Sequence, residues 1–288
     1  MEEKMITLAI QKKGRLAEDT RSLLKECGIK IQNGGGEKLI SEAKNFPLKL
    51  LCLRDDDIPA TVAAGVADIG IVGENTLLEK GMPYKLVEKL NFAHCCLSLA
   101  LPKSVDFNGL ETFHGMRIAT SYPKILQKFL QEKGISASIH EISGSVEAAP
   151  GIGLADAIFD IVSTGSTLTG NGLKEVYRVL KSQAVLVRYA DLPVEKLTLI
   201  QQLQFRIQAV RQGQQNKYIL LNTPNEKISE ITGLLPGMKS PTIMPLAMEG
   251  WSSLHSVIPE EAFWEKIEAL KATGAQGILV IPIEKMIV

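Results

Sequence analysis

The first half of the chain alternates short apolar runs with segments of helical character. Residues 6–10, 48–53 and 67–72 are apolar runs bounded by polar or glycine residues, a pattern typical of buried strands. Residues 16–27 and 58–64 have the spacing or composition of helices. Strands that alternate with helices pair in parallel through right-handed crossovers. The pattern therefore predicts an α/β layer, and ligands of such sheets bind at the carboxyl ends of the strands.

A second unit of similar pattern begins near His94. Its predicted strands and helices lie at 95–101, 117–120, 124–133, 136–142, 146–154 and 157–163. One more apolar run, 182–188, is placed to return to the first sheet. Two α/β lobes with a cleft between them are the simplest arrangement of these elements.

The order of elements changes in the C-terminal part. Residues 195–212 form a polar helix rich in glutamine, which suits a connector. The pattern beyond it predicts strands and helices at 217–221, 226–235, 242–246, 252–257, 260–273 and 277–281. This βαββαβ order is that of a ferredoxin-like split unit. Since the segment holds no obvious catalytic cluster, we expect it to bind an effector or contact other subunits.

Composition and charge narrow the classes of partner. Lys plus Arg and Asp plus Glu both number 32, so no net field attracts the chain to nucleic acid or an anionic membrane, and any phosphate binding must be local. The longest stretches without a charge, 90–102 and 161–173, have 13 residues each, whereas a membrane-spanning helix needs about 20. Acidic residues stand where a signal peptide would be basic. We therefore expect a cytoplasmic protein that binds neither nucleic acid nor membranes.

The four cysteines, Cys27, Cys52, Cys95 and Cys96, show no Cys-x-x-Cys spacing, and we interpret them as reduced and buried. His94 lies beside two of them, but neighbouring strand residues point to opposite faces and do not converge on one metal ion.

The most informative segment is DAIFDIVSTGST at 156–167. An apolar strand that carries Asp160 leads into five small residues, whose amides and hydroxyls can curl around a phosphate while the carboxylate holds ribose hydroxyls. That division of labour is usual in phosphoribosyl diphosphate sites. The alternative is a turn that merely caps the following segment. The loop lacks the P-loop lysine, and no Gly-x-Gly-x-x-Gly follows a strand, so kinase and dehydrogenase interpretations lose their main support.

Three further polar segments follow predicted strands. Lys12, Lys13, Gly14 and Arg15 place cations and a permissive glycine where a diphosphate or triphosphate can be gripped, although a solvated loop is an alternative. The sequence RDDDIP at 54–59 offers Arg54 as a ligand, with one aspartate as a helix cap and the others free to hold Mg²⁺ through water.

The third segment, DIGIVGEN at 68–75, ends a strand with glycines that permit close approach, and helix capping explains Glu74 and Asn75 equally well. No Ser/His/Asp arrangement is visible among the chain's four histidines, so covalent catalysis by a triad is not expected.

Taken together, these segments resemble the ATP phosphoribosyltransferase family in its long form. The resemblance spans nearly the whole chain. Its matching stretches are QKKGRL (11–16), RDDDIP (54–59), DIGIVGEN (68–75), RIATSYP (117–123), GSVEAAP (144–150), GLADAIFD (153–160), IVSTGSTL (161–168) and PIEKM (282–286).

The resemblance implies a reaction and a fold. The adenine ring nitrogen of ATP would attack the anomeric carbon of phosphoribosyl diphosphate and expel pyrophosphate, with Mg²⁺ as cofactor. The implied fold is α/β: a catalytic unit with two lobes like those of periplasmic binding proteins, then a ferredoxin-like (ACT-like) domain. Lobe I would comprise 1–94 and 176–212, lobe II 95–175, and a regulatory domain 213–288. Histidine would be the feedback inhibitor and the assembly a dimer in equilibrium with a hexamer.

The same resemblance assigns residues to each substrate. Phosphoribosyl diphosphate would contact Asp160, Ser163, Thr164, Gly165, Ser166 and Thr167. The nucleotide and diphosphate side would involve Lys12 or Lys13, Gly14, Arg15, Arg54, Asp68 and Glu74, with Tyr122 and Glu147 facing the cleft. Asp160, Arg15 and Lys13 are the candidate catalytic residues, and direct metal ligands are not assigned.

Thr242 and Ser256 are the candidate hydroxyls for the effector. One departure concerns the acid: common phosphoribosyltransferases carry two adjacent acidic residues before the loop, whereas Phe159 precedes Asp160 here. The alternative function is a non-catalytic two-lobed sensor of an anionic metabolite.

Overall fold

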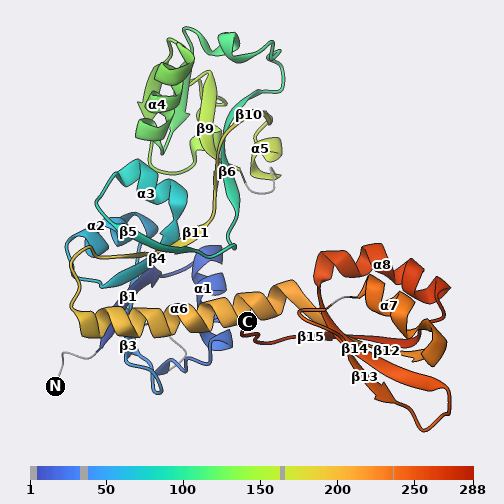
Figure 1. The fold of residues 1–288 in the computed structure, drawn as a ribbon. Helices are drawn as coiled ribbons and strands as arrows, with labels where there is room; N and C mark the ends of the chain where they lie inside the picture. The colour runs from blue at the N-terminus through green and yellow to red at the C-terminus, as the bar shows by residue number, and fades with distance from the viewer. Residues whose placement is uncertain (1–4, 33–37, 163–165, 236) are drawn as a thin grey trace. The chain divides into compact units, whose positions relative to one another are not determined.

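The computed structural model describes residues 5–32, 38–162, 166–235 and 237–288 (Figure 1). The chain forms two compact units. Unit 1 contains Met1–Ser22 and Ile29–Ile200, and unit 2 contains Leu23–Gly28 and Gln201–Val288. Each unit is described by itself.

Lobe I of unit 1 is built on a six-stranded sheet in the order β2-β3-β1-β4-β11-β5. Its strands are β1 (Ile6–Gln11), β2 (Ile40–Glu42), β3 (Leu48–Leu53), β4 (Ile69–Gly73), β5 (Lys85–Lys89) and β11 (Ala184–Arg188). The central strand β1 pairs in parallel with β3 and β4, as the alternation of elements predicts, and the remaining pairs are antiparallel. The carboxyl ends of β1, β3 and β4 therefore share one edge.

Three helices complete lobe I: α1 (Arg15–Glu26), α2 (Ile58–Ala63) and α3 (Glu74–Lys80). Gly70 allows α2 to pack directly on β4, because a Cβ at this position would lie 2.9 Å from methyl groups of Ile58 and Val62. The resulting core is buried, and Ile58, Val62 and Val187 are all fully excluded from solvent. The α1 and α3 helices each begin at or just after a strand's carboxyl end, which places their first turns at the shared edge.

Lobe II is built on a five-stranded sheet in the order β10-β6-β9-β7-β8. Its strands are β6 (Cys95–Pro102), β7 (Arg117–Thr120), β8 (Ser138–Glu141), β9 (Ala157–Val162) and β10 (Leu173–Ser182), with helices α4 (Pro123–Lys133) and α5 (Ser166–Gly170). Strand β7 runs parallel to both β8 and β9, so the carboxyl ends of these three strands also share an edge.

Two expectations for lobe II are wrong. The helix expected at 146–154 is only a 3₁₀ turn, η4 (Val146–Ala148), because Pro150 and two glycines follow and disfavour a continuing helix. The lobe also extends beyond residue 175, since β10 stays paired with β6 until Ser182 reaches Cys95. The chain thus returns to lobe I at Gln183.

Unit 2 contains the second part of α6 (Val194–Gln215) and a four-stranded antiparallel sheet in the order β13-β14-β12-β15. The elements after α6 are β12 (Asn216–Pro224), η5 (Asn225–Lys227), α7 (Ile228–Leu234), β13 (Thr242–Pro245), β14 (Trp251–Pro259), α8 (Glu260–Ala272) and β15 (Gln276–Pro282). This is the expected βαββαβ order with a ferredoxin-like arrangement of strands. Its core includes Leu221, Leu254 and Leu270.

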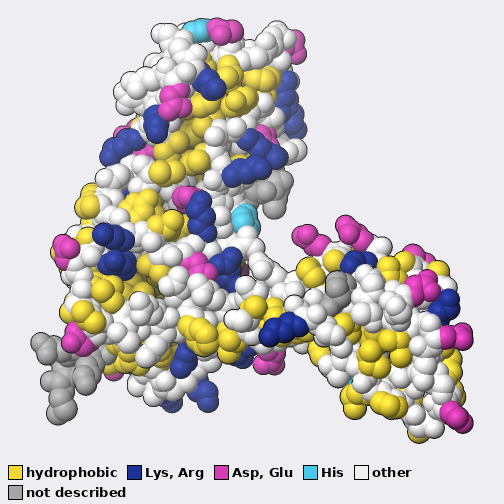
Figure 2. Space-filling view, viewed as in Figure 1, with side chains coloured by type: hydrophobic (Ala, Val, Ile, Leu, Met, Phe, Trp, Pro, Cys, Tyr) yellow, Lys and Arg dark blue, Asp and Glu magenta, His cyan; other side chains and the backbone are white. Residues whose placement is uncertain are grey.

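Surface charge agrees with the zero net charge of the sequence. On the face seen in Figure 2, Lys and Arg side chains are interspersed with Asp and Glu in both units. Within the ranges that the structure describes, no helix has both the length and the apolar character needed to cross a membrane.

Candidate active site

Three of the sequence segments meet at the shared strand edge of lobe I. The backbone N–H of Lys12 donates a hydrogen bond of 2.8 Å to the carbonyl of Leu53, which joins the loops after β1 and β3. The hydroxyl of Thr76 donates to Oδ2 of Asp55 at 2.7 Å, which joins the loop after β3 to the start of α3. The parallel order of the strands thus assembles the cationic and acidic segments that the sequence separates.

Lobe II meets this edge at Asn75, and the residue directly before β6 meets it at Arg15. The side-chain amide of Asn75 donates to the hydroxyl of Tyr122 at 3.2 Å, and Nη2 of Arg15 donates to the carbonyl of His94 at 2.8 Å. Between the lobes lies a pocket of about 230 Å³. Its lining residues are Gln11, Arg15, Leu16, Asp55, Gly73, Asn75, Ala93, Cys95 and Ile161.

Two glycines shape the lobe I side of this pocket. Gly14 has a φ of +100°, a conformation that other residues rarely adopt, and it lets the chain turn from β1 into α1 directly before Arg15. Gly73 leaves room for a neighbour, since a Cβ there would lie 2.5 Å from Oδ1 of Asn75. Arg15 and Lys13 are exposed and Lys12 is half-buried, so all three cations are accessible to solvent, and Arg15 lines the pocket.

The acidic side of the site centres on Asp160, which is partly buried in β9. Burial raises the pKa of this carboxyl from 3.8 to about 6, a hydrogen bond from the backbone N–H of Ile161 partly offsets the rise, and the charge of Glu147 adds to it. Burial also raises the pKa of Tyr122, and the charges of Asp160 and Asp55 add to that rise. Asp160, Asp55 and Tyr122 are therefore close enough to interact electrostatically, and a cation or a hydroxyl donor would stabilise the ionised carboxylates.

Most of the predicted phosphate loop lies outside the described residues. Ser163, Thr164 and Gly165 are not described, nor is the side chain of Ser166, which begins α5. Thr167 is exposed in α5. The assignment of this loop to a phosphate stays a prediction, carried by its position directly after β9.

Other predicted residues have different surroundings. Glu74 begins α3 and forms an ion pair of 3.0 Å with Lys89. Arg54 is exposed at the start of the 3₁₀ turn η2 (Asp55–Asp57), beside the edge but with its side chain toward solvent. Glu147 lies half-buried in η4, on the side of Asp160.

Asp68 is not brought to this edge, which corrects its assignment to the nucleotide side. It precedes the amino end of β4, whereas the pocket residues follow the carboxyl end. Its carboxylate is 4% exposed, accepts the backbone N–H of Thr7 at 2.8 Å and pairs with Nζ of Lys196 at 2.9 Å. Asp68 thus ties the first residues of α6 to the sheet of lobe I.

Replacement of Asp68 by Asn should lower the free energy of unfolding by about 2–3 kcal/mol, because it leaves the ammonium of Lys196 without its buried partner. Activity per folded molecule should change little. Chemical denaturation would measure this, with Asp156→Asn as the control. Asp156 also pairs with a cation, Arg117, but that pair is exposed and screened by solvent, so its loss should cost much less. Equal losses in both variants would contradict the structural role of Asp68.

The two candidate effector hydroxyls do not converge. Thr242 pairs with His255 across β13 and β14, so its side chain shares the sheet face of His255. Ser256 follows His255 and therefore points to the opposite face, where it is 5% exposed and its hydroxyl approaches the carbonyl of Leu235 at 3.4 Å. One small ligand on either face would reach only one of them.

The structure also shows site residues that the sequence interpretation missed. Asp55 and Asn75 line the pocket, and Ser182 supports Asn75 with a hydrogen bond of 2.8 Å to its Oδ1. Cys95 lines the pocket, and both Cys95 and Cys96 are half-buried rather than buried. All four cysteines are free, and within the described residues no three His, Cys, Asp or Glu side chains form a metal-binding cluster.

Comparison with known proteins identifies the family of the chain. The family model described as ATP phosphoribosyltransferase matches residues 54–209, and the model of the HisG C-terminal domain matches 213–285. An ATP phosphoribosyltransferase of Cytophaga hutchinsonii is 58% identical over 283 residues, which cover 98% of this chain and 99% of the relative. One from Bacteroides thetaiotaomicron is 55% identical over 284 residues, covering 99% of this chain and all of the relative.

A solved structure is also similar. The ATP phosphoribosyl transferase (HisG:HisZ) complex from Thermotoga maritima contains a chain that is 31% identical, with a TM-score of 0.58 and coverage of 70% of this chain and 98% of that one. These similarities do not favour a non-catalytic sensor. The chain belongs to the ATP phosphoribosyltransferase family and is an enzyme of histidine biosynthesis.

Proposed function

We propose that the pocket between the two lobes is where the phosphoribosyl group passes from phosphoribosyl diphosphate to the adenine ring of ATP, with release of pyrophosphate. The observation that carries the proposal is a pocket that brings Arg15 and Asp55 of lobe I together with the end of β9, the strand that carries Asp160. Arg15 and Asp55 of lobe I line the pocket with Ile161, the neighbour of Asp160 in lobe II.

Each edge has a chemical task in this reaction. Cleavage of the glycosyl bond develops positive charge on the ribose and negative charge on the leaving pyrophosphate. Arg15, with Lys12 or Lys13, stabilises the phosphate groups, and Asp160 holds ribose hydroxyls and stabilises the positive ring. The adenine nitrogen already carries a lone pair, so its attack needs no general base. Alignment of the two anionic substrates contributes the rest of the rate enhancement, and such orientation can lower an activation barrier by about 7–11 kcal/mol.

The remaining assignments follow the same division. The residues after β9, from Ser163 to Thr167, bind the 5′-phosphate through amides and hydroxyls, because small residues leave the backbone accessible. Tyr122 lies near Asp160 and Asp55 and offers a hydroxyl to the substrate. Arg54, Glu74 and Glu147 are assigned to the nucleotide or the diphosphate on the family resemblance.

The donor groups fit a Mg²⁺ ion that arrives with a substrate. Magnesium in such sites takes one or two carboxylates and completes its octahedron with phosphate oxygens and water. Asp160 and Glu147 interact as like charges, and Oδ1 of Asp55 is buried without a hydrogen-bond partner, so carboxylate oxygens are available on both lobes. When bound, the ion would neutralise charge on the leaving pyrophosphate.

We also propose that the enzyme works in the cytoplasm and that residues 213–288 bind histidine as a feedback inhibitor. The dimer and hexamer implied by the family resemblance belong to the same proposal. The independent core of the C-terminal sheet supports a separate regulatory role for this segment.

Incubation with ATP, phosphoribosyl diphosphate and Mg²⁺ tests the proposed function. Pyrophosphate and a product that absorbs in the near ultraviolet should form together, and omission of either substrate or of Mg²⁺ should abolish both signals. Binding of both substrates without pyrophosphate release would contradict the proposal and favour the sensor.

Replacement of Arg15 by Ala should lower kcat/KM by about 10–100-fold, because charge-assisted hydrogen bonds to a phosphate contribute about 1.5–3 kcal/mol. Steady-state kinetics measures the effect. Arg117→Ala is the control, because Arg117 lies at the amino end of β7 and pairs with Asp156 on the surface. Normal kinetics in a folded Arg15→Ala protein would contradict the role of Arg15 and favour the alternative that the Lys-Lys-Gly-Arg segment is a solvated loop.

A further inference from the structure

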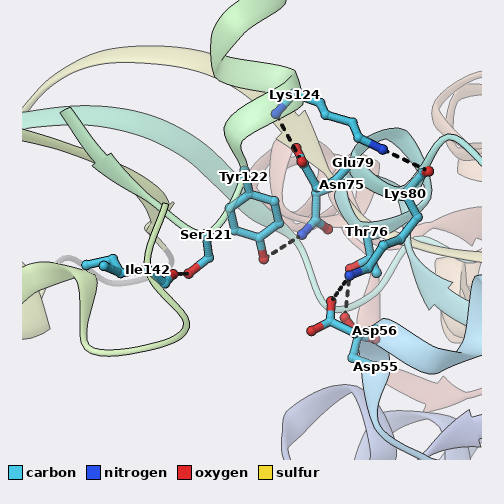
Figure 3. A network of polar contacts seen from close by, with 10 residues as sticks. All are labelled: Asp55, Asp56, Asn75, Thr76, Glu79, Lys80, Ser121, Tyr122, Lys124 and Ile142. Carbon is cyan, nitrogen blue, oxygen red and sulfur yellow. Dashed lines mark hydrogen bonds and ion pairs between the residues drawn. The ribbon is translucent and has the colours of Figure 1, made fainter. Parts of the chain in front are cut away.

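Helix α3 of lobe I supplies the cap of helix α4 in lobe II. Glu79, near the end of α3, is 7% exposed and accepts two backbone hydrogen bonds from α4. Lys124 donates its N–H to Oε1 at 3.0 Å (Figure 3). Ile125 donates its N–H to Oε2, also at 3.0 Å. Both oxygens of one carboxylate are thus used on the first turn of a helix that belongs to the other lobe.

The sequence of α4 explains why it needs this outside acceptor. Tyr122 occupies the N-cap position and makes no side-chain cap, and Pro123 at the first helical position has no N–H. The carbonyl of Tyr122 already accepts the N–H of Leu126. The free amides of the first turn are therefore those of Lys124 and Ile125, and a carboxylate at this end also meets the positive end of the helix dipole.

The other end of α3 holds Tyr122 itself. Asn75, in the first turn, donates to the hydroxyl of Tyr122 at 3.2 Å. Asn75 cannot swing freely, because it is 3% exposed and bonded to Ser182, and its Oδ1 occupies the space that a Cβ of Gly73 would fill. One short helix therefore holds the segment 122–125 through the hydroxyl of Tyr122, through the backbone after it, and through the ammonium of Lys124, which donates to the carbonyl of Lys80 at 3.4 Å.

Lobe II restrains the same segment from its own side. The N–H of Tyr122 donates to the hydroxyl of Thr120 at 2.8 Å, and the hydroxyl of Ser121 donates to the carbonyl of Ile142 at 2.8 Å. These bonds fix Tyr122 to its own sheet. The bonds from Glu79 and Asn75 fix it to the opposite lobe, beside the pocket.

We infer that Glu79 is a positioning residue: by capping α4 across the lobe boundary, it places the hydroxyl of Tyr122 toward the substrates. The inference rests on the proposed function, since the hydroxyl of Tyr122 matters only if the pocket is the active site. Glu79 itself contacts no substrate.

The variants Glu79→Ala and Glu79→Gln test this inference with a double-mutant cycle. Each is made in the wild-type chain and in Tyr122→Phe, which retains the ring and removes the hydroxyl. Glu132→Gln is the matched control, because Glu132 is an exposed glutamate on α4 itself. Thermal unfolding of every variant accompanies the kinetics.

In the wild-type background, Glu79→Ala should lower kcat/KM about tenfold, because a misplaced hydroxyl loses its hydrogen bond to the reacting groups. In the Tyr122→Phe background the same change should cost less than about twofold, because no hydroxyl remains to be misplaced. Glu79→Gln should fall between, since its carbonyl can accept one amide while its NH₂ group opposes the other. Glu132→Gln should match the wild type.

Equal losses from Glu79→Ala in both backgrounds would overturn the inference and assign Glu79 a structural role only. Full activity of Tyr122→Phe, or of both Glu79 variants, would overturn it as well. If Glu79→Ala does not fold, Glu79→Gln in the two backgrounds decides by the same comparison. Failure of the proposed function is a separate result, because the wild-type chain would then release no pyrophosphate.

Discussion

Replacement of Asp160 by Asn is expected to lower kcat/KM for phosphoribosyl diphosphate about 100-fold and to raise the free energy of unfolding by about 1–3 kcal/mol at pH 8. The activity is lost because the amide removes the negative charge proposed to face the ribose. Stability is gained because burial and Glu147 both oppose ionisation of this carboxyl, which the wild-type protein must nevertheless ionise at pH 8. Opposite changes in activity and stability are typical of a residue retained for function.

The dependence on pH follows from the raised pKa. The folded protein binds the Asp160 proton up to about pH 6, whereas an unfolded chain releases it near pH 3.8. Between these values the folded state carries more protons, so this group's contribution favours folding at low pH and is lost as the pH rises through about 6. The gain from Asp160→Asn should therefore be full at pH 8 and vanish near pH 4. Wild-type kcat/KM should also fall below about pH 6, where the free enzyme protonates Asp160.

Denaturant unfolding at pH 4, 6 and 8 would measure the stability change, with Asp156→Asn in parallel. The Asp156 carboxyl differs from that of Asp160, because hydrogen bonds from Arg117 lower its pKa to about 2 and because the Asp156–Arg117 pair lies on the surface. Its replacement should slightly lower stability at pH 8 and leave activity unchanged. An Asp160→Asn protein that is less stable than wild type at pH 8 would contradict the environment described for Asp160.

The strands were predictable where a run of apolar residues in the sequence corresponds to a strand that is buried on both faces of its sheet. The apolar runs that form β1 and β4 are almost continuous because most of their residues on both faces of the sheet are buried, whereas buried and half-buried residues alternate along β3. Strand β10 gave no such signal, since it is an edge strand with four charged residues and two irregularities in its pairing with β6. Each irregularity interrupts the two-residue alternation on which strand prediction depends. Helix α3 has only seven residues, too few for a clear helical period.

The site was predictable as a set of strand ends but not as individual side chains. The sequence places Arg15 and Asp160 after or within predicted strands, and topology then brings their edges together. Three consecutive aspartates cannot be told apart in the sequence, yet the 3₁₀ turn sends Asp55 to Thr76 and Asp56 to Lys80. Asp68 was misassigned because it lies before the amino end of β4, whereas the pocket lies at the carboxyl end of that strand. Its position along β4, and not its neighbours in sequence, decides what it contacts. Such distinctions arise only when separate elements pack.

The C-terminal sheet should bind histidine and inhibit the catalytic pocket, as the family resemblance implies. Deletion of 213–288 should therefore abolish inhibition and reduce particle size in the same preparation. The deletion also removes residues 283–286, whose backbone closely approaches Gly213 and bonds to Ala209 of α6, so some loss of stability is expected. Full inhibition by histidine in a folded truncated chain would contradict the regulatory assignment.

Point variants of the full chain then locate the histidine site. Thr242 and Ser256 lie on opposite faces of the sheet, so only one of them can contact a bound histidine. Thr242 is exposed, whereas Ser256 is buried. If the carboxylate of histidine accepts a hydrogen bond from the Thr242 hydroxyl, Thr242→Ala should weaken histidine binding by about 10–100-fold. Ser256→Ala should leave the affinity for histidine unchanged. Calorimetric titration measures both. Weakening by Ser256→Ala alone would place histidine on the helix-covered face, and weakening by neither would exclude both hydroxyls.

Since allosteric coupling is commonly about 1–3 kcal/mol, histidine should in turn weaken substrate binding by about 5–150-fold, and saturating substrate should weaken histidine binding by the same factor.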